Sequence, residues 1–321
     1  MSEAEIDEWG HEPIDVLYIV CKGRSGGTVL GRILGEIRGF CFVGETNLAP
    51  RVLLERRLCG CGVRFEDCAT GSAVRRRAGG GADPVLDAGL FGFGHALRSR
   101  HFPLAALPGG DGPLTRRLAG HLVACERLYR AIHTTMGATV IVDSSKSPSY
   151  GCLLSLVPAI RLHLVHLVRD PRAVAYSWRR RKLSPDVPGE RHGAQRGSFY
   201  SAWTWVPSNL WAELWWRRAP GRRLRLRYED FVARPQESIT RIVALVRKEP
   251  GDLPLAGERT VVFHAGHTVA GNMNRFLTGP IELAPDDEWK TRMRRGDYRL
   301  VTALTWPLLL RYGYLGTEAR T

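Results

Sequence analysis

The sequence lacks long apolar runs, and its first residues are acidic rather than apolar. No stretch reaches the roughly 20 apolar residues that a membrane span needs, and the apolar run Ala303–Leu310 is short and interrupted by Pro307. The opening segment MSEAEIDEWGHEPID has no apolar core, which excludes a signal peptide. The seven cysteines are an odd number without secretory context, so we expect mostly reduced thiols. We therefore expect a cytoplasmic protein with no membrane span.

Acidic residues are too few to balance the basic ones. The chain has 46 Lys and Arg against 32 Asp and Glu, a net charge of +14. Such an excess attracts polyanions, which include nucleic acids, phosphorylated cofactors and acidic substrates. The arginines lie in scattered runs. A solvent-exposed surface explains any single run as well as a polyanion-binding site does. Nucleic-acid motifs are lacking and the tryptophans gather in a predicted helix, so we expect no nucleic-acid partner.

Short apolar segments alternate with helical ones along the 321 residues. Strands are predicted at 15–23, 39–45, 139–145, 161–170 and 224–231, and the main helices at 28–37, 51–57, 113–133, 171–178, 199–218, 235–247 and 298–312. This alternation predicts an α/β fold with a central parallel sheet flanked by helices on both faces. Because the chain has no internal repeat and no low-complexity linker, we predict a single domain over residues 1–321.

Two segments interrupt the alternation. Residues 59–112 are rich in Gly, Arg and Cys with weak periodicity, which predicts an irregular insertion or lid. Residues 183–197 contain two prolines and three glycines, which predicts a loop over the active site. Ligands of open parallel sheets bind outside the carboxyl ends of the strands. The segments that follow predicted strands are therefore the candidate site: 23–28, 44–46, 143–146 and 169–172.

A turn of small residues and one arginine ends the first predicted strand. Its sequence is GRSGGT: Gly23, Arg24, Ser25, Gly26, Gly27 and Thr28. Small residues let the backbone approach an anion, and the following helix directs free N–H groups at it. Arg24 adds a guanidinium suited to phosphate or sulfate oxygens. The turn is either an anion-binding loop or a glycine turn without a ligand.

The same turn is not a Walker A loop. That pattern requires a lysine before its final Ser or Thr, whereas Gly27 precedes Thr28 here. An ordinary Mg-dependent kinase or GTPase is therefore disfavoured. An ATP-dependent kinase with a degenerate loop stays an alternative, as does a basic protein that binds nucleic acid without catalysis.

Three segments, in order along the chain, resemble the motifs of sulfotransferases that use 3′-phosphoadenosine 5′-phosphosulfate (PAPS). GRSGGTVLGRIL resembles their 5′-phosphosulfate loop, and LVRDPRAVAYSW resembles their 3′-phosphate motif, with Arg169 and Ser177 as its phosphate ligands. LRYEDFVARP resembles a segment whose tyrosine, here Tyr228, lies beside the adenine. The resemblance implies a P-loop-like sheet, PAPS as donor, adenosine 3′,5′-bisphosphate (PAP) as product, and no metal.

The resemblance also implies catalytic residues. Glu45, in FVGETNLAPRVL, corresponds to the base of tyrosylprotein and related sulfotransferases; its other interpretations are a helix cap or a structural ion pair. Lys146, in VDSSK, is expected to stabilise the leaving group together with Arg24, or else is a surface lysine that starts a helix. His192 in the predicted loop is an alternative base.

Weaker expectations concern neighbouring residues. Asp143 and Ser145 are placed to orient the lysine that follows them, and HTVAGNMNRF resembles a late segment that closes over the nucleotide, with Arg275 near the 3′-phosphate. The acceptor is expected to be a small molecule with a hydroxyl or amine. The Arg-rich sequence with its insertion is similar to bacterial enzymes, which favours a secondary metabolite or glycolipid.

The spacing C-x-C-x₆-C of Cys59, Cys61 and Cys68 falls short of a zinc motif. Zinc sites more often contain C-x₂-C pairs, and they need four ligands. Cys41 or a histidine is a candidate fourth ligand, but the expected arrangement is a reduced packing cluster or a redox-sensitive pair. The sequence thus predicts no metal.

Overall fold

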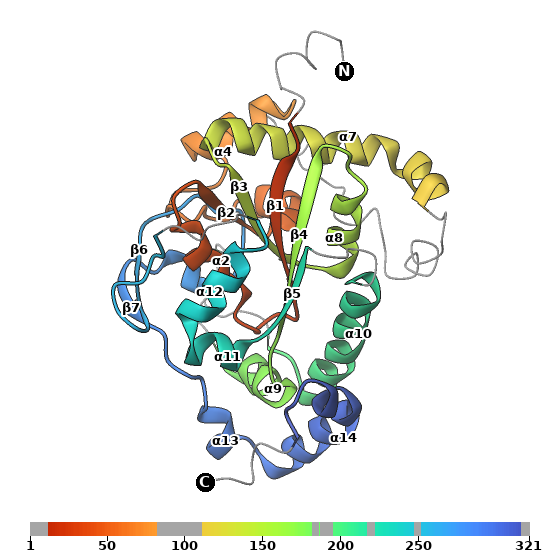
Figure 1. The fold of residues 1–321 in the computed structure, drawn as a ribbon, viewed down its shortest axis with the longest axis vertical. Helices are drawn as coiled ribbons and strands as arrows, with labels where there is room; N and C mark the ends of the chain where they lie inside the picture. The colour runs from red at the N-terminus through yellow and green to blue at the C-terminus, as the bar shows by residue number, and fades with distance from the viewer. Residues whose placement is uncertain are drawn as a thin grey trace.

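A five-stranded parallel sheet forms the centre of the protein (Figure 1). The computed structural model describes residues 12–81, 111–181, 186, 195–216, 222–246 and 252–315. The strands are β1 (Ile14–Cys21), β2 (Phe40–Gly44), β3 (Val140–Lys146), β4 (Ile160–Val168) and β5 (Arg223–Arg227), in the order β2-β3-β1-β4-β5. The predicted α/β fold with a central parallel sheet is confirmed.

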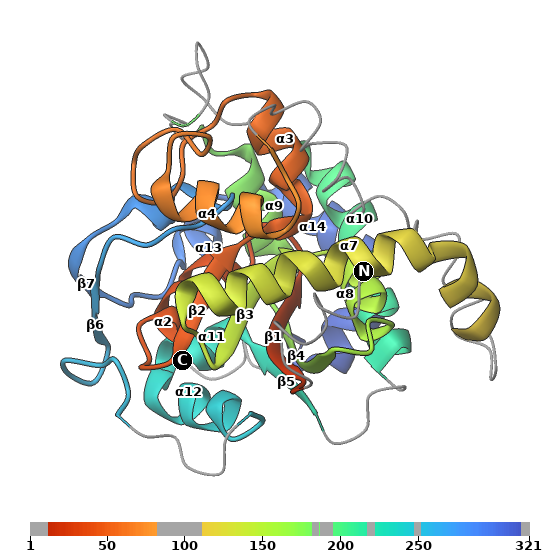
Figure 2. The ribbon, with the colours of Figure 1, turned by 90° about the horizontal axis from the view of Figure 1, so that it is seen from above.

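Helices cover both faces of this sheet. They are α2 (Gly27–Gly35), α3 (Ala49–Leu54), α4 (Ala69–Arg77), α7 (Asp111–Met136), α8 (Pro148–Ser155), α9 (Pro171–Arg179), α10 (Ser198–Trp216), α11 (Tyr228–Ala233), α12 (Pro235–Val243), α13 (Glu288–Arg292) and α14 (Arg295–Arg311), with the 3₁₀ turns η1 (Thr46–Leu48) and η4 (Met273–Phe276). Helix α4 lies against α7, on the opposite side of the sheet from α12 (Figure 2). None of the helices within the described ranges is long and apolar enough to cross a membrane.

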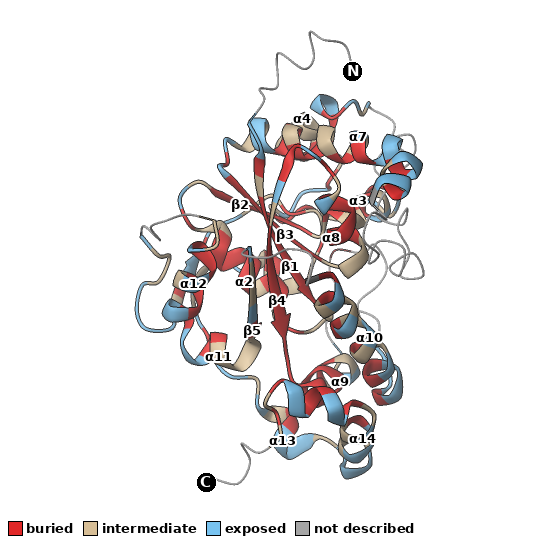
Figure 3. Ribbon diagram, turned by 45° about the vertical axis from the view of Figure 1, so that its right-hand side comes forward, coloured by how far each residue is buried: buried red, intermediate tan, exposed pale blue. Residues whose placement is uncertain are grey.

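The alternation of side chains along β1 creates two hydrophobic cores. Val16 and Tyr18 pack toward α7 and α8, whereas Leu17 and Ile19 pack toward α2 and α12. All four side chains are fully buried, and the central strands are buried along most of their length (Figure 3). A strand that is apolar on both faces is typical of a parallel sheet covered on both sides. The sheet is therefore a rigid base for the segments that follow its strands.

Two predicted elements were wrong in part. The predicted strand at 224–231 ends at Arg227, and α11 begins at Tyr228. Glu229 and Asp230 occupy the first turn of α11. Carboxylates there stabilise the helix, because they lie near the positive end of its dipole. The predicted irregular segment 59–112 contains the unpredicted helix α4 and the start of α7. Residues 82–110, and most of the predicted loop 183–197 with His192, lie outside the described residues.

A second, antiparallel sheet was missed by the sequence analysis. It pairs β6 (Thr260–Phe263) with β7 (Gly279–Glu282). The chain between these strands runs beside α2, and Arg32 of α2 donates hydrogen bonds to the carbonyl oxygens of His264 and Asn274, each at 2.8 Å. These contacts bring the segment after β6 to the carboxyl end of the sheet, beside the turn that follows β1.

Candidate active site

A cavity of about 330 Å³ lies at the carboxyl ends of the sheet strands. It is lined by Gly23, Arg24, Gly26, Gly27, Thr28, Val29, Glu45, Arg57, Lys146, Arg169, Ser177, Trp178, Tyr228, Gly271, Asn272, Met273, Asn274 and Asp286. The predicted donor-binding and catalytic residues are all in this lining except Ser25 and Arg275, and the alternative base His192 lies outside the described residues. The four segments that follow β1, β2, β3 and β4 thus meet at one cavity.

The turn after β1 requires a glycine at position 26. Gly26 caps α2 with φ of +90°, and a Cβ atom there would lie 2.5 Å from the ring of Tyr228. Arg24 also has a positive φ, +74°, and its guanidinium lies 4.8 Å from the ring centre of Trp178. Ser25 is buried beneath the turn, and its hydroxyl has no partner among the described residues. The turn presents α2 N–H groups and one guanidinium to the cavity, a combination that suits an anion.

Arg169 follows β4 and forms the opposite side of the cavity. Its guanidinium donates to the carbonyl oxygen of Arg24 at 2.9 Å and to the Asp286 carboxylate at 3.0 Å. It also lies 4.4 Å from the ring centre of Tyr228, while its buried Nε has no partner within the described part of the chain. Ser177 lines the cavity from α9 and is almost completely buried. We call Arg169, Ser177 and Tyr228 the β4 wall.

Asp286 is an unpredicted member of the site. Besides Arg169, it pairs with Arg180 at 2.8 Å. Burial by itself raises its pKa, but the hydrogen bonds and charges of the two arginines hold the pKa below its usual value. Asp286 lies in the connection between β7 and α13 and belongs to no recognisable motif, so only the folded structure identifies it. Asp286 and Arg169 both line the cavity, so a carboxylate is already paired with this guanidinium there.

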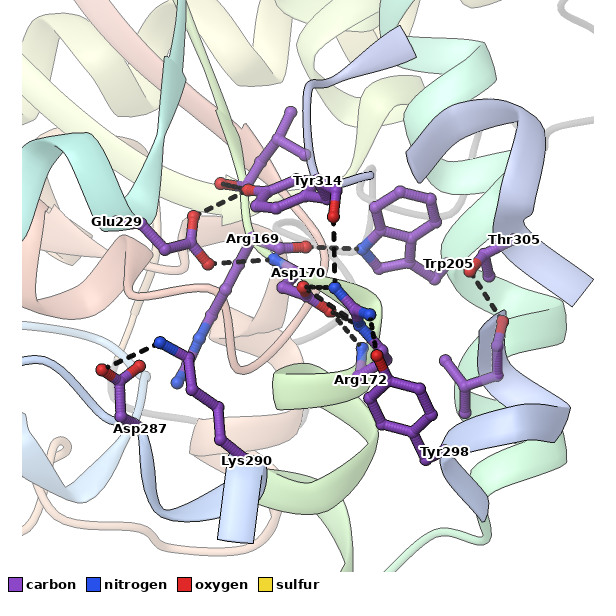
Figure 4. Close-up of polar contacts among 12 residues, drawn as sticks. Arg169, Asp170, Arg172, Trp205, Glu229, Asp287, Lys290, Tyr298, Thr305 and Tyr314 are labelled. Carbon is purple, nitrogen blue, oxygen red and sulfur yellow. Dashed lines mark hydrogen bonds and ion pairs between the residues drawn. The ribbon is translucent and has the colours of Figure 1, made fainter. Parts of the chain in front are cut away.

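A buried network fixes the start of α9 and with it the position of Arg169 (Figure 4). Asp170 caps the helix by accepting from the backbone N–H of Arg172 at 2.8 Å, and it pairs with the Arg172 side chain at 2.7 Å. The N–H of Asp170 donates to Glu229 at 3.1 Å, and the indole N–H of Trp205 donates to the carbonyl oxygen of Arg169 at 3.2 Å. Asp170 is thus paired with Arg172, while Arg169 lines the cavity.

Glu45 and Lys146 form an ion pair at the other side of the cavity. The Lys146 ammonium donates to the Glu45 carboxylate, and the two side chains are 17% and 13% exposed. Glu45 precedes η1 but makes no side-chain capping bond to it. Lys146 has φ of +65°, an uncommon backbone conformation for a residue with a side chain. We call Glu45 and Lys146 the β3 wall. In this wall a carboxylate, which can take up a proton, lies beside an ammonium group.

A buried polar cluster supports the β3 wall. Asp143 is fully buried and accepts from the Tyr129 hydroxyl at 2.5 Å, from the Ser145 N–H at 2.6 Å and from the Thr46 hydroxyl. Burial raises the pKa of Asp143, and the hydrogen bonds counteract that rise. The partners of Asp143 are thus hydroxyl and backbone groups rather than the Lys146 ammonium. The cluster fixes the backbone next to both wall residues, because Thr46 follows Glu45 and Ser145 precedes Lys146.

Arg275 does not reach the cavity. Its guanidinium is buried, pairs with Asp186 at 2.8 Å and donates to the carbonyl oxygens of Leu58 and Val269 at 3.0 and 3.2 Å. Its neighbours 271–274 do line the cavity, so the segment is placed as expected but this side chain points elsewhere. The reason is the pairing with Asp186, which no local sequence pattern indicates.

A model of the sulfotransferase family matches residues 17–247. The "Sulfotransferase Domain from the Curacin Biosynthetic Pathway" is 16% identical, with 92% of this chain and 99% of that chain covered and a TM-score of 0.48. The "Sulfotransferase Domain from the Synechococcus PCC 7002 Olefin Synthase" is 16% identical, with 92% and 96% covered and a TM-score of 0.43. A search of curated proteins gave no match. The family match includes both walls and the turn after β1.

Proposed function

This chain belongs to the sulfotransferase family, and we propose that it transfers a sulfuryl group from PAPS to a hydroxyl or amine of a small acceptor. The observation that carries the proposal is the composition of one cavity. The anion-binding turn after β1, the β4 wall and the β3 wall all face it. A nucleotide with anionic groups on both the 3′ and the 5′ positions of its ribose requires two separate anion sites. The turn after β1 and the β4 wall are the two candidates in this cavity.

The proposed donor orientation follows from these two sites. The 5′-phosphosulfate lies on the turn Gly23–Thr28, where α2 N–H groups and Arg24 bind its oxygens. The 3′-phosphate lies against Arg169 and Ser177, and the adenine lies beside Tyr228. Asp286 competes for Arg169, because both the carboxylate and the phosphate are anions. Binding of the donor therefore displaces the Asp286 carboxylate from Arg169.

The proposed chemistry uses the β3 wall. The acceptor oxygen or nitrogen attacks the sulfur, the bond from sulfur to the bridging phosphate oxygen breaks, and the acceptor proton passes to the Glu45 carboxylate. Negative charge that develops on the leaving phosphate is offset by Lys146 and Arg24. The Glu45–Lys146 pair must separate for this step, because each group then serves a different reactant. The leaving group is already a good one, so the transfer itself requires no metal.

For the acceptor we propose a bacterial secondary metabolite or a glycolipid. The support is the Arg-rich, insertion-bearing sequence rather than any contact in the cavity. A screen of candidate alcohols and amines with ³⁵S-labelled PAPS identifies the acceptor by the labelled product.

Calorimetric titration tests the class of function. We expect PAP to bind more tightly than ATP, and a random oligonucleotide to bind weakly and only at low salt. Preference for ATP would indicate a kinase, and preference for the oligonucleotide would indicate a nucleic-acid-binding protein. Either preference would contradict the proposal.

A further inference from the structure

The fold completes a cluster of metal-ligand type that the sequence leaves incomplete. Cys59, Cys61 and Cys68 lie together before α4, and His267 joins them from the segment after β6. The ligand atoms of the four residues all lie within 4.8 Å of one another. The spacing of the cysteines and the lack of an identified fourth ligand were the reasons to expect no metal here, and the tertiary structure provides that ligand. We propose that Cys59, Cys61, Cys68 and His267 bind one structural zinc ion.

Two of the distances between ligand atoms are close to those of a tetrahedral zinc site. Zinc–sulfur bonds of about 2.3 Å and zinc–nitrogen bonds of about 2.0–2.1 Å place two sulfurs about 3.8 Å apart, and a sulfur and a nitrogen about 3.5 Å apart. The Sγ atoms of Cys61 and Cys68 are 3.8 Å apart, and Cys68 Sγ lies 3.2 Å from His267 Nδ1. Zinc therefore fits between these atoms with only small side-chain movements.

The backbone holds the two contributing segments together without the metal. The Cys59 N–H donates to the Val63 carbonyl at 2.7 Å, which closes a tight loop, and the Gly60 N–H donates to the Thr268 carbonyl at 3.1 Å. A Cβ atom on Gly60 would lie 2.4 Å from the Thr268 hydroxyl, so glycine is required for this approach. Rigid, preformed ligand placement distinguishes a binding site from a chance gathering of cysteines.

The surroundings of Cys68 also suit anionic sulfur. The Gly71 N–H donates to Cys68 Sγ at 3.4 Å, where the sulfur caps α4 and meets the positive end of the helix. Binding of Zn²⁺ releases the three thiol protons to solvent and leaves a site of net charge −1. The buried Arg275 donates to the carbonyl oxygen of Leu58, directly before Cys59, and so helps to hold the start of the cysteine segment.

The ligand set indicates a structural rather than a catalytic role. Three thiolates and one imidazole fill the four positions that zinc prefers, leaving none for substrate, and they select zinc over Mg²⁺ or Ca²⁺. The site links the Cys59–Cys68 loop to the segment that continues into the cavity lining 271–274. Zinc thus anchors one side of the cavity at a distance from the reacting atoms. This inference does not depend on the proposed function.

Elemental analysis of the purified full chain tests the site without any substrate. We expect one zinc per chain in the wild type, and the same in the controls His264→Ala, on the same segment, and Cys41→Ser, outside the cluster. His267→Ala and Cys61→Ser each remove a ligand at the less buried side of the cluster. Their zinc affinity should fall by more than about 100-fold, since even loss of a supporting contact costs 10–100-fold.

Cobalt substitution of the wild type keeps the proposal testable if a variant does not fold. The expected spectrum has the visible bands of tetrahedral Co²⁺ and thiolate charge-transfer absorption. Either of two results would overturn the proposal. One is a folded wild type that takes up neither metal when zinc and cobalt are supplied under reducing conditions. The other is His267→Ala with unchanged zinc affinity.

Discussion

The two walls of the cavity differ in how firmly their charged groups are held. In the β4 wall, Arg169 bonds Arg24 and Asp286 and stacks on Tyr228, and a buried network fixes its backbone. In the β3 wall a buried cluster also fixes the backbone, but Lys146 contacts Glu45 and both side chains are partly exposed. The firmly held wall suits binding of a fixed anion. The looser pair suits chemistry, because its members must separate when donor and acceptor arrive.

Loss of the base should give the largest effect in this comparison. Glu45→Gln keeps the shape of the side chain but removes its capacity to take a proton. We expect turnover to fall by about 10²–10⁴-fold with PAP affinity nearly unchanged. Glu36→Gln, at a surface pair with His264, is the matched control and should leave turnover unchanged. Full activity in Glu45→Gln would show that Glu45 is structural.

Removal of the partner cation should affect both binding and chemistry. Lys146→Ala is expected to lower turnover by about 10²–10³-fold, because a donor aimed at developing negative charge is lost. It should also weaken PAPS binding if the contact exists before reaction. Steady-state rates and calorimetry on the same preparation separate these effects. Unchanged turnover would contradict the role of the β3 wall.

The sequence predicted the β4 wall more completely than the β3 wall, for a physical reason. Arg169 and Ser177 lie eight residues apart on one strand–helix connection, so a local motif contains both. Glu45 and Lys146 are 101 residues apart, and only the adjacency of β2 and β3 makes them a pair. The sheet itself was predictable because apolar runs and helices alternate.

Contacts between segments distant in sequence could not be predicted. Asp286 reaches Arg169 from a connection without a motif, and Arg275 is turned away from the cavity by Asp186. His267 lies 199 residues from Cys68, so the cysteine spacing alone did not indicate a fourth ligand. In each case the deciding partner comes from a loop, whose position depends on packing rather than on local pattern.

Protonation of a buried histidine outside both walls should have an effect between the largest and the smallest of these predictions, on stability rather than on activity. His166 pairs with Asn209 at 2.9 Å, and burial lowers its pKa from 6.5 to about 4. The unfolded chain therefore binds a proton at this histidine at higher pH than the folded chain does. The stability that neutral His166 contributes to the folded state is complete above pH 6.5 and is lost as the pH falls toward 4. Between pH 7 and pH 5 it amounts to about 2 kcal/mol.

Urea unfolding of wild type and His166→Gln at both pH values measures this contribution. The free energy of unfolding of the wild type should fall more steeply toward pH 5 than that of the variant. Equal slopes would show that His166 is not responsible.

Removal of the competing carboxylate should give the smallest effect, and it should strengthen ligand binding rather than weaken it. Asp286→Asn keeps the size of the side chain but no longer offers an anion to Arg169. We expect PAP to bind a few-fold more tightly, because the phosphate then meets less competition and less repulsion. Asp287→Asn, at the neighbouring exposed position, is the control. Weaker PAP binding in Asp286→Asn would show that the carboxylate positions Arg169 for the ligand.

The most direct test of the central claim, that the β4 wall binds the 3′-phosphate, is calorimetry of Arg169→Ala. Each charged hydrogen bond to a phosphate contributes about 1.5–3 kcal/mol. We expect a large loss of affinity for PAP and almost none for adenosine 5′-phosphosulfate, which has no 3′-phosphate. Arg161→Ala, at the exposed end of β4, should change neither affinity. Equal losses for both ligands in Arg169→Ala would contradict binding of the 3′-phosphate by the β4 wall.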